Sequence, residues 1–159
     1  MKRMLLASAA MAILTGAASA EEVKIGISIG FTGPLESLAP AMAAGAELAM
    51  KEVSDSGKLL DGSTLVPVRA DSTCIDAAAA TAAAERIVTS DRVKAIMGGM
   101  CSGETIATLQ NVAMPNGIVM ISPSATSPAL STMESNGLFF RTSPSDARQG
   151  QVTVSYTHL

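Results

Sequence analysis

Short apolar runs alternate with helical patterns along most of the chain. The first run, VKIGISI at residues 23–29, is rich in β-branched side chains, and turn-forming residues then lead into a helical pattern over 38–53. The alternation repeats four times. Further strands are expected at 64–70, 93–99, 117–122 and 137–143. Segments expected to form helices follow at 77–90, 101–113 and 144–152, and a Ser/Pro-rich segment follows at 123–131. This order predicts an α/β fold with a doubly wound parallel sheet and helices on both faces.

The expected strands are continuous apolar runs, which indicates burial on both faces of the sheet. Pro67 is the exception, because it has no backbone N–H to give to a neighbouring strand, and the second strand is therefore expected near an edge. Helices are expected to begin near Pro40 and Asp146 and to end at Gly57 and Gly117.

The N-terminal segment does not belong to this pattern. It begins with two cations, continues with apolar residues 4–14 and ends on Ala18-Ser19-Ala20, so we expect a secretory signal peptide cleaved after Ala20. A membrane anchor is the alternative, but the apolar stretch is shorter than the roughly 20 residues that a spanning helix needs.

The last residues also differ from the rest. Residues 153–159, TVSYTHL, are rich in β-branched side chains and supply no helical stripe. We therefore expect the tail from Thr153 not to be the native continuation of the preceding helix.

Composition narrows the range of partners. The chain has 159 residues, of which 48 % are hydrophobic, with three Phe, one Tyr and no Trp, and this allows one domain with an aliphatic core. Without the two cations of the signal peptide the net charge changes from −3 to −5, and no basic run remains. Nucleic acids and anionic membranes are therefore poor candidate partners.

The chain has two cysteines, Cys74 and Cys101. Export favours a disulfide, with two free thiols as the alternative. No metal site is expected, because the only histidine, His158, stands far from both cysteines and the ten methionines are scattered through apolar stretches typical of a core. No cofactor is expected either, because GGMCSGET at 98–105 matches neither phosphate-binding glycine motif.

Three loops are candidates for a binding site, because ligands of open parallel sheets bind outside the carboxyl ends of the strands. They are residues 30–38, 98–104 and 122–128. In the second loop, two glycines allow close backbone approach, and Ser102 stands at a helix start where a hydroxyl and free N–H groups suit an anion such as a carboxylate. The alternative for Ser102 is that it only caps its helix. The alternative for the third loop is that it is an ordinary Ser/Pro turn without a binding role.

An enzymatic function is not expected. A serine nucleophile at Ser102 needs a base, His158 is the only histidine, and MCSGE lacks the G-x-S-x-G spacing. Glu36, Asp71 and Glu104 form no evident acid/base pair and are expected at the solvated surface or in the first turn of a helix.

Several motifs together resemble the first lobe of the periplasmic branched-chain amino-acid-binding proteins of ABC transporters. They are the signal peptide, KIGISIGFTGPLESL, DSTCID with GGMCSGET, ISPSATSPAL and FFRTSPSDARQGQ, and the resemblance covers about residues 23–152. It implies a two-lobed, hinged protein with strand order 2-1-3-4-5 that closes on its ligand. The expected division is a signal peptide at 1–20, an N-terminal ligand-binding lobe at 21–146, and the start of the next helix with the tail at 147–159.

The resemblance also implies roles for individual residues. Ser102 would donate to the α-carboxylate of an amino acid, Thr126 would contact its head group, and the Ser124 carbonyl would accept from its ammonium. Leu38 stands where well-known members place an aromatic residue. The resemblance implies leucine, isoleucine and valine as ligands, and the departure at Leu38 leaves another amino acid or a small amide as the alternative.

Finally, the resemblance implies a Cys74–Cys101 disulfide, a periplasmic location, a permease in the inner membrane as partner, and a monomeric state. The expected function is solute binding for an ABC transporter. A ligand sensor with the same fold is the first alternative, and a serine esterase acting through Ser102 is the second.

Overall fold

A computed structural model describes residues 20–59 and 62–157. The expected signal peptide, apart from Ala20, and His158 lie outside these residues. No helix within the described part is long and apolar enough to cross a membrane.

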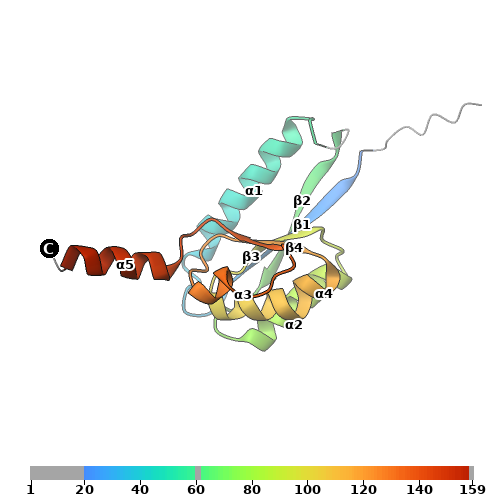
Figure 1. Cartoon of the computed structure of the whole chain (residues 1–159). Helices are drawn as coiled ribbons and strands as arrows, with labels where there is room; N and C mark the ends of the chain where they lie inside the picture. Colours follow the sequence, from blue (N-terminus) through green and yellow to red (C-terminus); the bar gives the residue numbers. More distant parts are fainter. Residues whose placement is uncertain (1–19, 60–61, 158–159) are drawn as a thin grey trace, which may run out of the picture.

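Five parallel strands form one sheet in the order β2-β1-β3-β4-β5 (Figure 1). The strands are β1 (Glu22–Ile29), β2 (Thr64–Asp71), β3 (Ala95–Gly98), β4 (Val119–Ser122) and β5 (Phe139–Arg141). The helices are α1 (Ala39–Asp55), α2 (Ala77–Thr89), α3 (Ser102–Thr108), α4 (Met114–Asn116) and α5 (Asp146–Thr157), and a π-helical segment, Leu109–Ala113, joins α3 to α4. The predicted fold class and strand order are confirmed, and β2 with its Pro67 lies at an edge as expected.

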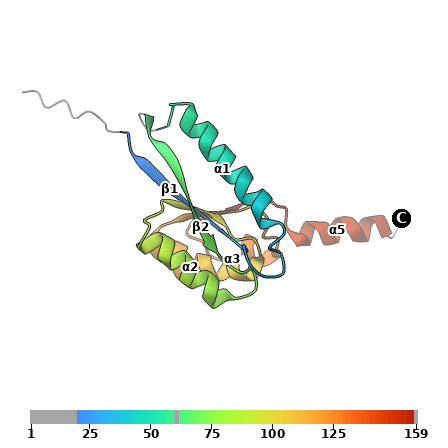
Figure 2. The ribbon, with the colours of Figure 1, turned by 180° about the vertical axis from the view of Figure 1, so that it is seen from behind.

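The helices form two layers around the sheet. Helix α1 lies on one face, over β1 and β2, and α2, α3 and α4 lie on the other (Figures 1 and 2). The core on the α1 face includes Ile27, Ile29, Ala39, Ala43 and Met50, and the core on the opposite face includes Ala70, Ile87, Ile96, Leu109 and Met120. Alternate residues of the central strands therefore face two separate apolar layers.

The expected burial of every strand on both faces is wrong for β4 and β5. Met97, Ile121 and Phe140 follow one another across β3, β4 and β5 in register on the α1 face. Helix α1 packs mainly on β1 and β2, and Ile121 remains 43 % exposed and Phe140 54 % exposed.

Residues 123–131 form no α-helix, in agreement with the turn expected of the Ser/Pro-rich loop at 122–128. They make an irregular turn that ends in one 3-10 helix, Pro128–Ser131. Hydroxyl groups bind the backbone here: Ser122 Oγ accepts from Ala125 N at 2.9 Å, and Ser127 Oγ accepts from Ala129 N at 3.3 Å. Such local hydrogen bonds compete with those of a helix, and they hold this segment as a turn.

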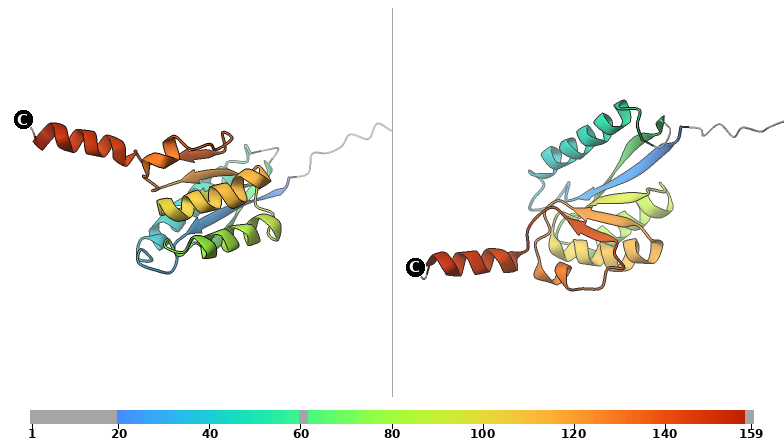
Figure 3. Two further views of the ribbon diagram at one scale, coloured as in Figure 1. Left: turned by 60° about the horizontal axis from the view of Figure 1, so that its bottom comes forward. Right: turned by 45° about the horizontal axis from the view of Figure 1, so that its top comes forward.

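Helix α5 continues to Thr157, beyond the helical segment expected at 144–152. The hydroxyls of Thr153, Ser155 and Thr157 donate to carbonyls one turn earlier at 2.9–3.0 Å. The weak helix propensity of Thr and Val costs only a few tenths of a kcal/mol per residue and is easily overcome. No residue of α5 is buried, and the helix extends away from the sheet (Figure 3).

The start of α2 provides a local stability test. Asp76 caps the helix, and its Oδ1 accepts from Ala78 N at 2.9 Å and from Ala79 N at 3.0 Å. We expect Asp76→Ala to lower the free energy of unfolding by about 1 kcal/mol, measured by urea denaturation. The control Asp76→Asn keeps the acceptor and should retain most of the stability; equal losses in both variants would contradict the cap assignment.

A candidate ligand pocket at the carboxyl ends of the strands

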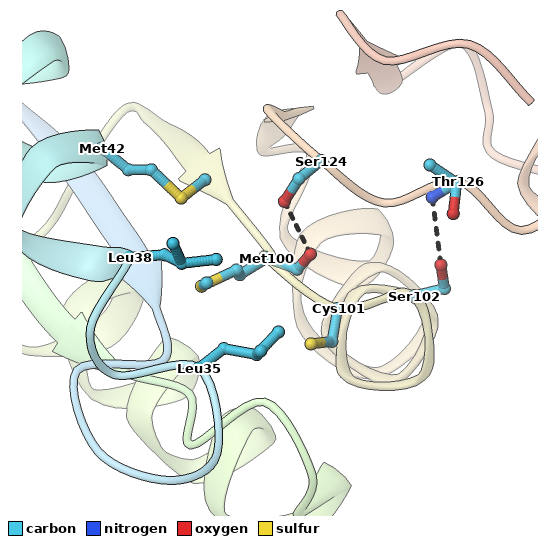
Figure 4. A pocket seen from close by; sticks show the side chains of 8 residues that line it. All are labelled: Leu35, Leu38, Met42, Met100, Cys101, Ser102, Ser124 and Thr126. Atoms are coloured by element: carbon cyan, nitrogen blue, oxygen red, sulfur yellow. Dashed lines mark hydrogen bonds between the residues drawn. The ribbon is translucent and has the colours of Figure 1, made fainter.

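The loops after β1, β3 and β4 meet at one open cavity of about 320 Å³ (Figure 4). It is next to the point where strand order reverses, between β1 and β3, which is the usual ligand position in open α/β sheets. The four residues predicted to contact a ligand all line it. The complete lining is Leu35, Leu38, Met42, Met100, Cys101, Ser102, Ser124 and Thr126.

The pocket has an apolar side and a hydroxyl side. Leu35, Leu38 and Met42, from the first loop and the start of α1, form the apolar side (Figure 4). Leu38 is 53 % exposed, so apolar surface is available to a ligand. Sequence reasoning missed Met42 and assigned it to the core, although its position one helical turn after Leu38 places both on the same face of α1.

The hydrogen bonds of Ser102 fix the role that its hydroxyl can play. Its Oγ accepts from the backbone N–H group of Thr126 at 3.1 Å (Figure 4) and from that of Ser127, also at 3.1 Å. A hydroxyl has two acceptor positions and one donor hydrogen, so these two bonds leave the O–H group as a donor. Ser102 is therefore suited to bind an acceptor such as a carboxylate oxygen.

The neighbouring turn offers hydrogen-bond acceptors to a ligand, where Ser102 offers a donor. Ser124 Oγ donates to the Met100 carbonyl at 2.7 Å, and Thr126 Oγ1 donates to Asp146 Oδ2 at 2.9 Å. The Ser124 carbonyl accepts no hydrogen bond from any residue of the described ranges. Carbonyl and hydroxyl lone pairs on this side of the pocket can therefore accept from a cationic group.

Arg141, at the end of β5, holds the backbone of this turn through hydrogen bonds from its guanidinium group. Its Nη1 donates to the carbonyls of Ala125 at 3.2 Å and Ser127 at 2.9 Å, and Ser143 Oγ also donates to the Ala125 carbonyl at 3.1 Å. Sequence reasoning assigned no role to Arg141. Its position directly after an apolar strand was the available signal, because that end of a parallel sheet faces the loops of the site.

The expected disulfide joins Cys74 to Cys101, with their Cα atoms 5.2 Å apart. Cys74 is 5 % exposed and packs in the core on the α1 face. The bond ties the loop after β2 to the residue immediately before Ser102. It therefore restrains the backbone on which the Ser102 side chain is presented.

Glu104 lies in the first turn of a helix, which is one of its two expected positions, but it is buried and not solvated. The residue lies in the first turn of α3, is 2 % exposed, and its Oε1 accepts from Met100 N at 2.6 Å and Cys101 N at 3.1 Å. Burial raises its pKa to about 7, and the hydrogen bonds from the two N–H groups, with the nearby Ser72 hydroxyl, oppose that rise. Room for the carboxyl exists because Gly99 has no Cβ, which would overlap it.

Glu36 and Asp71 follow the earlier expectation more closely. Glu36 is exposed, and Asp71 is half-buried at the end of β2. Burial raises the pKa of Asp71, hydrogen bonds from Thr32 and Thr73 lower it, and the net result is a pKa below its usual value. Neither carboxyl lines the cavity.

These features define a class of protein. Within residues 20–59 and 62–157, no group of three or more His, Cys, Asp or Glu side chains could hold a metal ion. The pocket instead offers fixed hydrogen-bond donors and acceptors beside an apolar wall. The fold and the pocket are those of a ligand-binding α/β lobe.

The profile of the family described as "Periplasmic binding protein" matches residues 22–158, and the chain belongs to this family. It is 32 % identical over 152 residues to the Leu/Ile/Val-binding protein of Citrobacter freundii, a match that covers 96 % of this chain and 40 % of the relative. It is 34 % identical to the leucine-, isoleucine-, valine-, threonine- and alanine-binding protein of Pseudomonas aeruginosa, covering 93 % of this chain and 39 % of the relative.

A solved structure agrees with these relatives. The branched-chain amino acid transporter substrate binding protein LivJ of Streptococcus pneumoniae, in complex with isoleucine, has a TM-score of 0.70 and 31 % identity. The match covers 79 % of this chain and 34 % of that one. The resemblance drawn from the motifs is confirmed, and the chain spans about two fifths of the length of the relatives it matches.

Proposed function

We propose that this chain is the N-terminal lobe of an extracytoplasmic solute-binding protein that captures leucine, isoleucine, valine or a related amino acid for an ABC transporter. The observation that carries the proposal is a single pocket with hydroxyl groups on one side and aliphatic side chains on the other. That division matches an amino acid with a charged head and an apolar side chain. The ligands in the names of the relatives support the same class.

The hydrogen bonds of the pocket suggest how the ligand lies. The Ser102 O–H group donates to the α-carboxylate, and the Ser124 carbonyl accepts from the ammonium group. The aliphatic side chain of the ligand then lies against Leu38 and Met42. Hydrogen bonds to charged groups are stronger than neutral ones, so most of the specificity for the head group comes from the loops after β3 and β4.

The proposal includes a second lobe that closes over the open pocket and buries the ligand. In this proposal, residues 1–20 are removed on export and residues 21–146 form the N-terminal lobe. The protein acts as a monomer in the periplasm and delivers its ligand to a membrane permease. It contains no catalytic step. Ser102 accepts two backbone N–H groups, which holds its hydroxyl as a donor and does not activate it as a nucleophile.

The first test is Ser102→Ala. Loss of a hydrogen bond to a charged group costs about 1.5–3 kcal/mol, so we expect roughly 10- to 150-fold weaker binding of leucine, isoleucine and valine. Titrations followed by NMR chemical shifts measure this even where binding is weak. Ser90→Ala, an exposed serine in the turn after α2, is the matched control. Equal affinity in wild type and Ser102→Ala would remove Ser102 from the site.

A further inference from the structure

The carboxyl group of Glu104 lies beneath the loop that presents Ser102, and it uses only one of its oxygens. Oε1 accepts two backbone N–H groups, from Met100 and Cys101. Oε2 is buried and has no hydrogen-bond partner among the described residues. A carboxylate buried in this way lacks compensation for half of its charge, which is costly in a protein interior.

The surroundings of this carboxyl are polar but uncharged. The Ser72 hydroxyl lies near the carboxyl without meeting hydrogen-bond geometry, and it is buried with no partner within the described part of the chain. No charged neighbour contributes to the pKa shift of Glu104. Helix α2 packs on α3, and strands β1 and β2 pack on α2. The charged side chains of these three elements are exposed or half-exposed; they are Glu22, Lys24, Arg69, Asp71, Glu85 and Arg86.

The carbonyl groups of the same loop are held from other directions. Gly99 O accepts from Ser122 Oγ, and Met100 O accepts from Ser124 Oγ, both at 2.7 Å. Glu104 is the side chain that holds the N–H groups on the opposite side of the backbone. A change in the charge or position of its carboxyl therefore alters the hydrogen bonds that hold the loop before Ser102.

We propose that Glu104 is a positioning residue for the carboxylate of the ligand: its buried side chain fixes the loop that presents Ser102, and it does so as a neutral acid when the site is filled. This inference rests on the proposed function. A neutral carboxylic acid still accepts both N–H groups through one oxygen, and its other oxygen carries a proton that can be donated to a buried hydroxyl. It also avoids a second negative charge beneath an anionic ligand group.

The proposal gives a defined direction for pH. The pKa of Glu104 is already raised to about 7 by burial, and a nearby ligand carboxylate should raise it further. Binding then takes up a proton between pH 7 and the higher pKa of the complex. The affinity for leucine should be greatest below pH 7 and should fall as the pH rises, by about tenfold for each unit by which binding raises the pKa.

Glu104→Gln, which mimics the neutral acid, is the main test. We expect this variant to bind leucine as tightly as wild type does at pH 6 and to lose the decline of affinity that wild type shows up to pH 8.5. Glu104→Ala leaves two N–H groups without their acceptor and should bind at least tenfold more weakly at every pH. Glu52→Gln, an exposed carboxyl on α1, is the control for the loss of one negative charge.

Carbon-13 NMR of the Glu104 carboxyl, with and without leucine, provides a second readout that a purely structural role would not affect. Its titration midpoint should rise when leucine binds. Leucine binding with unchanged midpoint, or with Glu104→Gln weaker than wild type at pH 6, would overturn this inference alone. If wild type binds neither leucine, isoleucine nor valine at pH 6, the proposed function itself fails.

Discussion

Reduction of the Cys74–Cys101 disulfide is expected to lower the free energy of unfolding by about 3–4 kcal/mol, which is the chain-entropy value for a bridge between residues 27 apart in sequence. The bond joins the loop after β2 to the residue before Ser102, and Cys74 is buried in the core. For a chain of this size the melting temperature should fall by about 10 °C. Thermal unfolding followed by circular dichroism, with and without reductant, measures the change.

The matched control is the double variant Cys74→Ala with Cys101→Ala. It should melt near the temperature of reduced wild type and should not respond to reductant. Intact mass after alkylation should show two labelled thiols only after reduction. Labelling of both cysteines without reductant, or an unchanged melting temperature, would show that the bond does not stabilise the fold.

The strand order and the layers illustrate what the sequence can predict. Five apolar runs separated by helical patterns predict a parallel sheet, and Pro67 places the second run at an edge for a definite chemical reason. The helical tail was not predictable from pattern, because its hydroxyl groups bind carbonyls of the preceding turn instead of packing on a core. The exposure of Phe140 depends on how far α1 reaches across the sheet, which no local pattern records.

The candidate site shows a similar limit. Ser102, Ser124 and Thr126 stand in loops whose position after strands identifies them in advance, and the structure brings them to one cavity. The polarity of the Ser102 hydroxyl depends on two N–H groups that are 24 and 25 residues away. The burial of Glu104 likewise depends on Gly99, because the Glu104 carboxyl occupies the space that a side chain at position 99 would fill. A first-turn glutamate therefore lies inside the protein.

That burial leads to the second large effect, a loss of stability with rising pH. The pKa of Glu104 is about 7 in the folded protein, against 4.5 for the ordinary group. Between these two pH values the folded state holds a proton on Glu104 that the unfolded state has released. The stabilisation that Glu104 gives to the folded state is therefore complete below pH 4.5 and is lost as the pH rises through 7. A pKa change of this size corresponds to about 3 kcal/mol. The lowered pKa of Asp71 acts in the opposite direction and only below about pH 4, outside this window.

Urea denaturation of wild type and Glu104→Gln at intervals from pH 5 to pH 8 tests this directly. The glutamine keeps an acceptor for the N–H groups of Met100 and Cys101 and cannot ionise, so we expect the two proteins to have similar stability at pH 5 and the variant to be more stable at pH 8. The free energy of unfolding of Glu52→Gln should change with pH as that of wild type does from pH 5 to pH 8. Parallel curves for wild type and Glu104→Gln would mean that the Glu104 carboxyl titrates alike in the folded and unfolded chains, and a buried neutral acid beneath Ser102 would then have to be abandoned.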